Sequence, residues 1–143
     1  GKTKETKIAV ALINKGVSLK KWEELNTIAH LNAAFGARVG KSLLLQDTIK
    51  TKDDAEIKLN IQHAILIKEA HSSKELIDII TQAKQQGLEV AEFTREMIQT
   101  TDDKKVISLT STKDLKEVEY LGALIFGNKT AVDALTKSLN LYS

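Results

Sequence analysis

The segment 120–130, YLGALIFGNKT, carries residue types that could bind a phosphate group. Two glycines, Gly122 and Gly127, precede Lys129 and Thr130, an order similar to that of the glycine-rich loops that bind nucleotides. In such a loop the lysine directly follows the second glycine, whereas here Asn128 stands between them. The four residues between the glycines are apolar and predict a buried strand rather than an open loop. The segment is therefore not predicted to bind a nucleotide.

The junction at Gly127 and Asn128 could still bind an anion through its backbone amides. It joins the carboxyl end of a predicted strand to the start of a predicted helix, where free backbone amides can hold an anion. The alternative is that the Asn128 side chain caps this helix and occupies one of these amides. We favour the cap, and we expect a small anion or a partner to bind near this strand end.

Histidine, serine and tryptophan give few further signs of chemistry. His30, His63 and His71 lack the spacing of a metal site, and no serine stands in a nucleophile elbow. His30 follows Asn26 by four residues, so the two share a helix face and could line a pocket; a polar edge facing solvent is the commoner arrangement. Trp22 is predicted to pack beneath a hairpin or helix, with the edge of a binding cleft as the alternative. No metal, cofactor or catalytic triad is predicted.

Composition excludes several classes of protein. The 143 residues include no cysteine, which rules out disulfides and cysteine nucleophiles and is compatible with the cytoplasm, where we place the protein. A formal charge of +2 without gathered basic residues is too small to indicate nucleic-acid binding. No apolar run is long enough to span a bilayer, and no secretory signal is predicted before the first strand.

Four main strands and one hairpin are predicted from hydrophobic patterns. Residues 7–14 and 63–70 are nearly continuous apolar runs, typical of strands covered on both faces of a sheet. Residues 88–93 and 119–127 predict two more strands. Residues 42–61 read as two short strands around a polar turn, which predicts a peripheral β-hairpin.

Helices are predicted between these strands. Ser18 is expected to cap a long helix whose apolar residues cover most of its circumference, so that the helix is largely buried. Residues 72–87 form a helix with a capping box at its start and a glycine at its end, and residues 128–139 form the last helix. Between them, residues 100–105 are expected to turn and residues 106–110 to form a short strand.

This order predicts an α/β fold, a single-domain three-layer sandwich with a mixed sheet of about four main strands flanked by helices, plus the peripheral hairpin. Residues 1–6 are polar and lysine-rich and are expected to be a flexible N-terminal segment. Residues 7–143 are expected to form the single α/β domain.

The closing segment resembles the end of the family known as domain of unknown function 2000, which finishes with a similar strand, glycine turn and helix. The matching positions in that segment are Tyr120, Leu121, Gly122, Gly127, Ala131, Val132, Leu135, Thr136, Leu139 and Leu141. The first helix agrees through Asn26, Thr27, Ala29, Leu31 and Gly36, and residues 92–94 add an acidic residue followed by phenylalanine and threonine. The resemblance thus covers most of the chain.

That family in turn is similar to the type 2 peptidyl-tRNA hydrolases, whose last helix has a similar pattern at Asp133, Thr136, Leu139, Leu141 and Tyr142. The resemblance implies a four-stranded mixed sheet between helices. It also implies a catalytic lysine, aspartate and threonine, at whose positions this sequence has Trp22, Arg95 and Tyr120. Lys21 is one residue away from the lysine position, but Arg95 reverses the charge of the aspartate.

We therefore expect a relative of these hydrolases that has lost the chemistry and binds a small anionic ligand or a partner. The alternatives are a peptidyl-tRNA or related ester hydrolase, with tRNA as its substrate and Lys21 and Tyr120 as its catalytic candidates, and a module for homo-oligomerisation or protein interaction through the hairpin. The expected ligand-binding residues are Lys21, Asn26, His30, Arg95, Tyr120 and Asn128.

Overall fold

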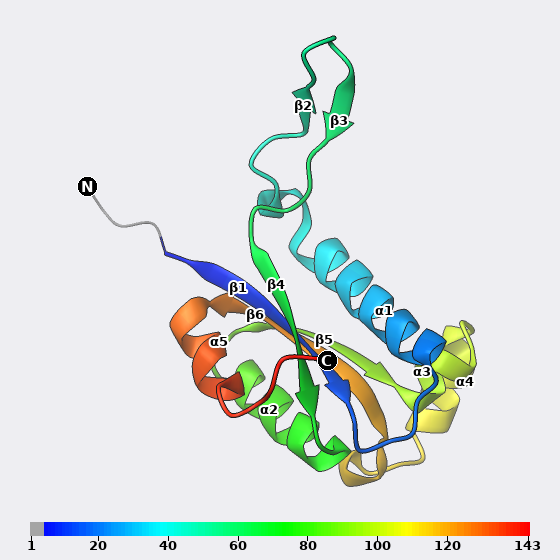
Figure 1. Ribbon diagram of the computed structural model, residues 1–143. Coiled ribbons are helices and arrows are strands. Elements are labelled where there is room, and N and C mark those ends of the chain that lie inside the picture. Colours follow the sequence, from blue (N-terminus) through cyan, green and yellow to red (C-terminus); the bar gives the residue numbers. More distant parts are fainter. Residues whose placement is uncertain (1–4) are drawn as a thin grey trace.

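The structure is a computed structural model that describes residues 5–143 of the chain (Figure 1). Its strands in this part of the chain are β1 (Lys7–Asn14), β2 (Thr48–Lys50), β3 (Glu56–Lys58), β4 (Ala64–Ala70), β5 (Glu89–Thr94) and β6 (Tyr120–Asn128). The main sheet has the order β4-β1-β6-β5. β1 is parallel to β4 and antiparallel to β6, and β6 is antiparallel to β5. The carboxyl ends of β1, β4 and β5 therefore lie at the same end of the sheet.

Helices cover both faces of this sheet (Figure 1). They are α1 (Lys21–Val39), α2 (Ser73–Gln85), α3 (Arg95–Gln99), α4 (Asp103–Thr110) and α5 (Lys129–Thr136), with 3-10 turns η1 (Gly40–Leu43) and η2 (Leu115–Glu117). α1 packs on one face, mainly against β5 and β6, whereas α2 and α5 pack on the other face. The predicted α/β sandwich with a mixed four-stranded sheet is thus confirmed.

The two central strands, β1 and β6, hold the core together. Residues 8–14 of β1 are all buried, as the continuous apolar run predicts. Successive side chains of β1 point to opposite faces. Val10 and Leu12 therefore join the core beneath α2 and α5, while Ala11 joins the core beneath α1 with Leu31 and Phe35. Burying each large apolar side chain contributes about 1.5–3 kcal/mol to folding stability, so these two strands contribute much of the stability of the sheet.

Gly122 in β6 allows α1 to approach the sheet closely. A Cβ atom at Gly122 would lie 2.5 Å from the Leu12 carbonyl oxygen and 2.8 Å from Thr27 Cγ2. Both distances are shorter than van der Waals contact, so only glycine leaves room for Thr27, which is fully buried on α1.

The ends of α2 confirm the Ser72 cap and the Gly87 stop, but not the reciprocal half of the predicted capping box, because the Glu75 carboxylate accepts from the His71 amide at 2.8 Å instead of from Ser72. The Ser72 hydroxyl oxygen accepts a hydrogen bond from the Glu75 amide at 3.1 Å, and Gly87 follows the helix with a φ of 72°. The predicted cap of α1 is wrong, because the N-cap is Lys20 and not Ser18. The Lys20 amide donates to the Glu23 carboxylate at 2.9 Å, so the amide of the N-cap residue is satisfied by an acidic side chain from the first turn.

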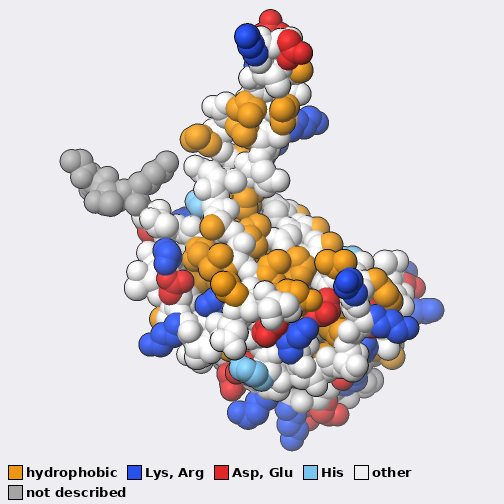
Figure 2. Space-filling view, viewed as in Figure 1, with side chains coloured by type: hydrophobic (Ala, Val, Ile, Leu, Met, Phe, Trp, Pro, Cys, Tyr) orange, Lys and Arg blue, Asp and Glu red, His pale blue; other side chains and the backbone are white. Residues whose placement is uncertain are grey.

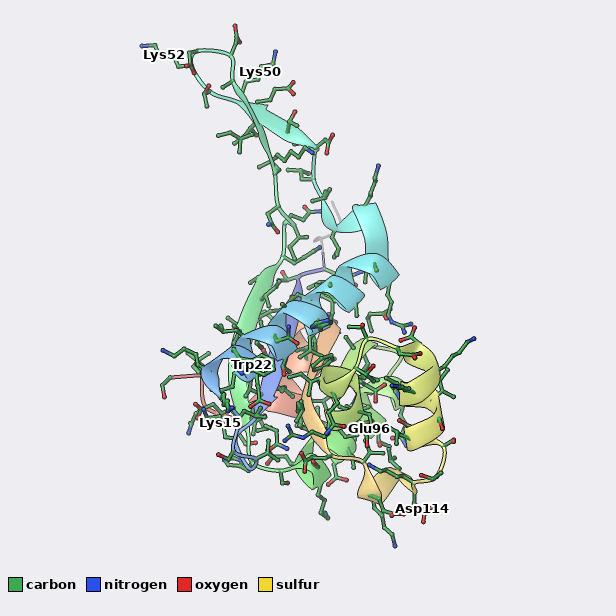
Figure 3. The ribbon with its side chains drawn as sticks, turned by 90° about the vertical axis from the view of Figure 1, so that its right-hand side faces the viewer. Lys15, Trp22, Lys50, Lys52, Glu96 and Asp114 are labelled. Carbon is green, nitrogen blue, oxygen red and sulfur yellow. The ribbon has the colours of Figure 1, made fainter. Side chains whose placement is uncertain are left out.

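α1 is less buried than its composition predicts. Only Thr27, Leu31 and Phe35 of α1 are buried, whereas Trp22 is 57% and Leu25 is 64% exposed. The prediction that Trp22 packs beneath a hairpin or helix is therefore wrong. Figure 3 shows Trp22 near the start of α1, and exposed apolar side chains are visible over the body in Figure 2. A single layer of sheet beneath the helix buries only one stripe of its surface.

The predicted strand at residues 106–110 is wrong, because these residues form most of α4. The Asp102 carboxylate caps this helix by accepting a hydrogen bond from the Lys104 amide at 3.0 Å. Val106 and Thr110, one helical turn apart, are half-buried, while Ile107 and Leu109 are exposed. The β-branched residues Val106 and Ile107 favour a strand locally, whereas the Asp102 cap and the half-buried stripe of Val106 and Thr110 suit a helix.

The predicted hairpin is confirmed by β2 and β3, which pair antiparallel and project away from the sheet (Figure 1). Of the predicted flexible segment 1–6, residues 1–4 lie outside the described residues. Glu5 and Thr6 are described and contact the start of α5, since Thr6 accepts a hydrogen bond from the Lys129 amide at 2.9 Å.

Candidate functional site

Arg95 is the first residue of α3 and directly follows the carboxyl end of β5. Its Nη2 is 2.8 Å from a Glu119 carboxylate oxygen, and its Nη1 is 3.6 Å from Glu23 on α1. Two acidic groups therefore already neutralise the guanidinium. Arg95 connects α1 to the segment before β6, and this arrangement leaves it less charge for a bound anion.

Tyr120 is the first residue of β6, at the same end of the sheet as Arg95, but its side chain points beneath α2. The Tyr120 hydroxyl donates to Glu92 at 2.7 Å, and the other Glu92 oxygen pairs with Lys84 at 3.1 Å. Burial and the hydrogen bond to the Glu92 carboxylate raise the pKa of Tyr120 well above its usual range. The hydroxyl therefore stays protonated and acts as a donor, which does not suit a nucleophile or general base. Tyr120 lines a cavity of about 290 Å³ with Glu92 and Leu115.

Glu96 is a buried acidic residue that the sequence analysis missed. It is only 3% exposed and pairs with Lys113. Figure 3 labels Glu96 on the body of the molecule. Burial alone would raise the pKa of the Glu96 carboxyl, but the Lys113 ammonium, the Glu96 backbone amide and the Thr94 hydroxyl together lower it. No local pattern in the sequence reveals this pair, because its partners are separated by 17 positions. The pair fastens the segment after α4 to α3.

His30 and Asn26 share a face of α1, as predicted, but Asn26 contributes through its backbone. The His30 Nδ1 lies 3.0 Å from the Asn26 carbonyl oxygen. Because a carbonyl only accepts, Nδ1 is the donor in this contact, and Nε2 is an acceptor in the matching neutral tautomer. The imidazole stacks on Phe93 with ring centroids 4.8 Å apart. Lys21 is exposed at the start of the same helix.

A cavity of about 310 Å³ opens beside His30, between α1, β5 and the α3–α4 segment. Ala34, Met97 and Val106 supply apolar wall, and Asp103 adds a carboxylate. An apolar pocket with a few convergent polar groups is the usual form of a binding site. The sequence analysis found His30 but not Asp103, because α4 was not predicted as a helix.

Asn128 lies at the far end of β6 from Tyr120 and caps α5, as we favoured. Its Oδ1 accepts from the Ala131 amide at 3.1 Å, and its Nδ2 donates to Glu5 at 2.8 Å. Asn128 lines a cavity of about 450 Å³ with Lys7 and Glu5. Two amides at this helix start are thus occupied, one by Asn128 and one by the Thr6 carbonyl.

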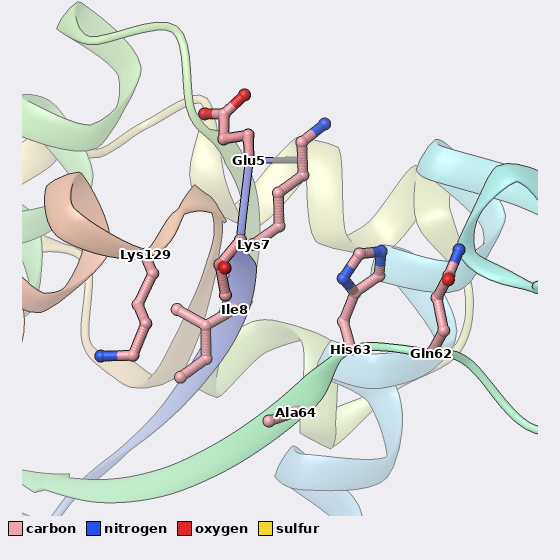
Figure 4. A pocket seen from close by; sticks show the side chains of 8 residues that line it. Glu5, Lys7, Ile8, Gln62, His63, Ala64 and Lys129 are labelled. Carbon is pink, nitrogen blue, oxygen red and sulfur yellow. The ribbon is translucent and has the colours of Figure 1, made fainter. Parts of the chain in front are cut away.

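A second cavity at this strand end, of about 350 Å³, contains more positive charge (Figure 4). Figure 4 shows Lys129 on one side and His63 on the other, with Lys7 between them and its ammonium directed away from that of Lys129; Ile8 and Ala64 add apolar lining. Lys129 also pairs with Asp133 one turn along α5. The sequence analysis predicted this strand end as an anion site but did not identify the lysines, because they come from opposite ends of the chain.

The six predicted ligand residues do not share one cavity. His30, Tyr120 and Asn128 line three different cavities, while Arg95 is held by two carboxylates. Among residues 5–143, no group of three or more histidine, aspartate or glutamate side chains is placed to hold a metal ion. None of the helices described for this stretch is long and apolar enough to cross a membrane.

Comparison with known proteins identifies the family of this sequence. The sequence matches the family described as protein of unknown function (DUF2000) over residues 6–143. No curated protein matches the sequence. The fold is similar to that of a protein of unknown function, Atu0240, from Agrobacterium tumefaciens strain C58, with a TM-score of 0.79 and 15% sequence identity over 96% of this chain and 98% of that chain. The family match covers nearly the whole chain, so the protein belongs to the DUF2000 family.

Proposed function

We propose that this protein is a cytoplasmic relative of the type 2 peptidyl-tRNA hydrolases, similar to them in fold, that binds a small anionic ligand without hydrolysing it. The ligand would occupy the cavity between Lys7, Lys129 and His63. The single observation that carries the proposal is that two lysines and a histidine line one cavity of about 350 Å³ with a partly apolar wall. Ammonium groups form charge-assisted hydrogen bonds with phosphate or carboxylate oxygens, and a cavity of this size accepts a small molecule.

The local charges support an anion at this position. Among the described residues that line the cavity, Glu5 is the one acidic residue, and although it keeps its charge when it accepts a hydrogen bond from Asn128, the two lysines outnumber it. Within residues 5–143, Lys7 has no acidic partner at ion-pair distance, so its charge is free for a ligand. His63 can add a further positive charge when it is protonated.

The loss of hydrolase chemistry is supported by the positions that would carry it. The Arg95 guanidinium is paired with the carboxylates of Glu23 and Glu119, and the Tyr120 hydroxyl donates a hydrogen bond to Glu92. Neither residue can orient a water as a general base. We expect no release of the amino-acid ester from a labelled N-blocked aminoacyl-tRNA. Turnover that falls in Lys21→Ala or Tyr120→Phe would instead establish the hydrolase.

Titration with inorganic phosphate at constant ionic strength, followed by amide chemical shifts, tests the anion site. We expect shifts at Lys7, His63 and Lys129, and at least about tenfold weaker binding, or 1.4 kcal/mol, in the double variant Lys7→Gln/Lys129→Gln. The matched control is Lys58→Gln/Lys74→Gln, which removes one lysine from an exposed strand and one from an exposed helical ion pair. Equal binding by both double variants, or no shift at these residues, would reject the proposed site.

Self-association through the hairpin is a second candidate, and one observation favours it. Ile49 and Ile57 face each other across β2 and β3 and are 43% and 51% exposed. A two-stranded hairpin is marginally stable in water by itself, so a second copy covering these side chains would stabilise it. Light scattering should then show a mass that rises with concentration and returns to the monomer value in Ile49→Ser/Ile57→Ser. A monomer at every concentration would exclude this candidate.

A further inference from the structure

The two edge strands of the main sheet, β4 and β5, differ in whether another segment is hydrogen-bonded to their outer side. The edge at β4 is covered by the end of the chain: the Glu69 amide donates to the Asn140 carbonyl at 2.9 Å, and the Tyr142 amide donates to the Ile67 carbonyl at 2.9 Å. β5 forms the opposite edge and, among the strands described for residues 5–143, pairs with β6 only. An unpaired edge strand presents backbone donors and acceptors that can pair with another chain.

Cavities open on both faces of β5 at the same point. The cavity of about 310 Å³ beside His30 lies on the α1 face, and the cavity of about 290 Å³ beside Tyr120 lies on the α2 face. Glu92 lines both of them. The two cavities therefore flank one stretch of the β5 edge.

This arrangement matches the periodicity of an added strand. Side chains of an extended peptide alternate between the two faces of a sheet. A peptide hydrogen-bonded along β5 would thus direct one side chain into the His30 cavity and its neighbour into the Tyr120 cavity. In strand addition the main chain supplies affinity and such alternate pockets supply specificity.

The His30 cavity is suited to a basic side chain. Asp103 supplies a carboxylate, and in the neutral tautomer whose Nδ1 donates to the Asn26 backbone carbonyl the His30 Nε2 is an acceptor. The apolar wall of Met97 and Val106 can cover the aliphatic stem of a lysine or arginine. The charge of the cavity is therefore complementary to a cation.

The Tyr120 cavity is suited to an apolar side chain. Ile77, Ile80 and Leu115 supply much of its wall. Its acidic group, Glu92, is already satisfied by the Tyr120 hydroxyl at 2.7 Å and by Lys84 at 3.1 Å. A second charged side chain would find no free partner there, whereas an aliphatic one would bury apolar surface.

We propose that the β5 edge binds an extended peptide of a partner protein by strand addition, with a lysine or arginine in the His30 cavity and an adjacent aliphatic residue in the Tyr120 cavity. This site is on another part of the molecule from the Lys7–Lys129 cavity, and the inference does not depend on the anion proposed for that cavity.

An array of capped hexapeptides tests the pairing of the two positions. The peptides carry Lys, Arg, Glu, Leu or Ser at their third and fourth positions in every combination, with threonine elsewhere. We expect the peptides with a basic residue next to leucine to bind at least tenfold more tightly than those with glutamate in place of the basic residue. No binding by any peptide, or equal binding of lysine and glutamate peptides, would overturn the proposal.

Two controls separate strand addition from side-chain insertion alone. The best peptide is remade with alternate amides N-methylated, in both registers, and one register should lose at least tenfold in affinity because its donors to β5 are removed. Asp103→Asn should reduce the preference for lysine over glutamate, whereas Asp78→Asn on α2 should not, and circular dichroism confirms that both variants fold. Full affinity in both N-methylated registers, or an unchanged preference in folded Asp103→Asn, would contradict the proposal.

Discussion

The Arg95 guanidinium lies 2.8 Å from the Glu119 carboxylate and 3.6 Å from that of Glu23. Arg95 thus serves as a connection between α1, α3 and the start of β6, at a position where the proposed resemblance to type 2 peptidyl-tRNA hydrolases would imply an aspartate. The charge reversal and the two carboxylates belong together, because the arginine needs both acidic neighbours when it is partly buried.

Replacing Arg95 should destabilise the fold. Arg95→Ala leaves Glu119 and the half-buried Glu23 without their partner, and hydrogen bonds to charged groups contribute about 1.5–3 kcal/mol each to stability. We expect the free energy of unfolding in urea to fall by about 1–3 kcal/mol, with a smaller fall for Arg95→Lys. Arg38→Ala, on the exposed end of α1, is the control and should change stability by less than about 0.5 kcal/mol. An Arg95→Ala protein as stable as Arg38→Ala would show that the ion pairs are not needed.

The Glu96–Lys113 pair should make stability depend on acid pH. The pKa of Glu96 is lowered from its ordinary value of 4.5, so its contribution is present above that value and is lost as the pH falls through the lower, folded-state pKa. Glu96→Gln should therefore be less stable than the native protein at pH 7, and the difference should shrink toward pH 2. Urea unfolding across this range measures it, with Glu56→Gln on exposed β3 as the control. A difference that stays constant with pH would contradict the assignment.

Tyr120 should resist ionisation. The pKa of Tyr120 is raised above its ordinary value of 10.0 by burial and by Glu92, so the stability it contributes is complete below that value and is lost only as the pH rises toward the folded-state pKa. In Tyr142→Phe, where Tyr120 is the only tyrosine left, the phenolate absorbance should appear together with the loss of circular dichroism at high pH. Phenolate formation in the folded protein near pH 10 would mean that the hydroxyl is not buried.

Two glycine substitutions should have opposite effects. Gly122→Ala places a Cβ 2.5 Å from the Leu12 carbonyl oxygen and should lower the free energy of unfolding by about 1–3 kcal/mol through overpacking. Gly36→Ala on α1 meets no atom within 4 Å and should raise it by about 0.5–1 kcal/mol, because alanine favours the helix. Thermal unfolding of both variants measures the two shifts, and a tolerated Gly122→Ala would show that α1 is not held closely against β6.

The fold could largely be predicted because its signals are local. The continuous apolar runs of β1 and β6 indicate strands covered on both faces, and the Ser72 cap and Gly87 mark the ends of α2. α4 was missed because its β-branched residues Val106 and Ile107 favour a strand, and the cap at Asp102 is a weak signal in a polar segment.

The candidate site depends on contacts between distant parts of the chain. The sequence by itself determined the alternation of strands and helices, the hairpin and the capping role of Asn128. Only the tertiary structure decided that Arg95 is neutralised by Glu23 and Glu119, and that Lys7 and Lys129 meet at one cavity. The physical reason is range: hydrophobic periodicity and capping act within a few residues, whereas these charge pairs and cavities form only when folding brings distant segments of the chain together.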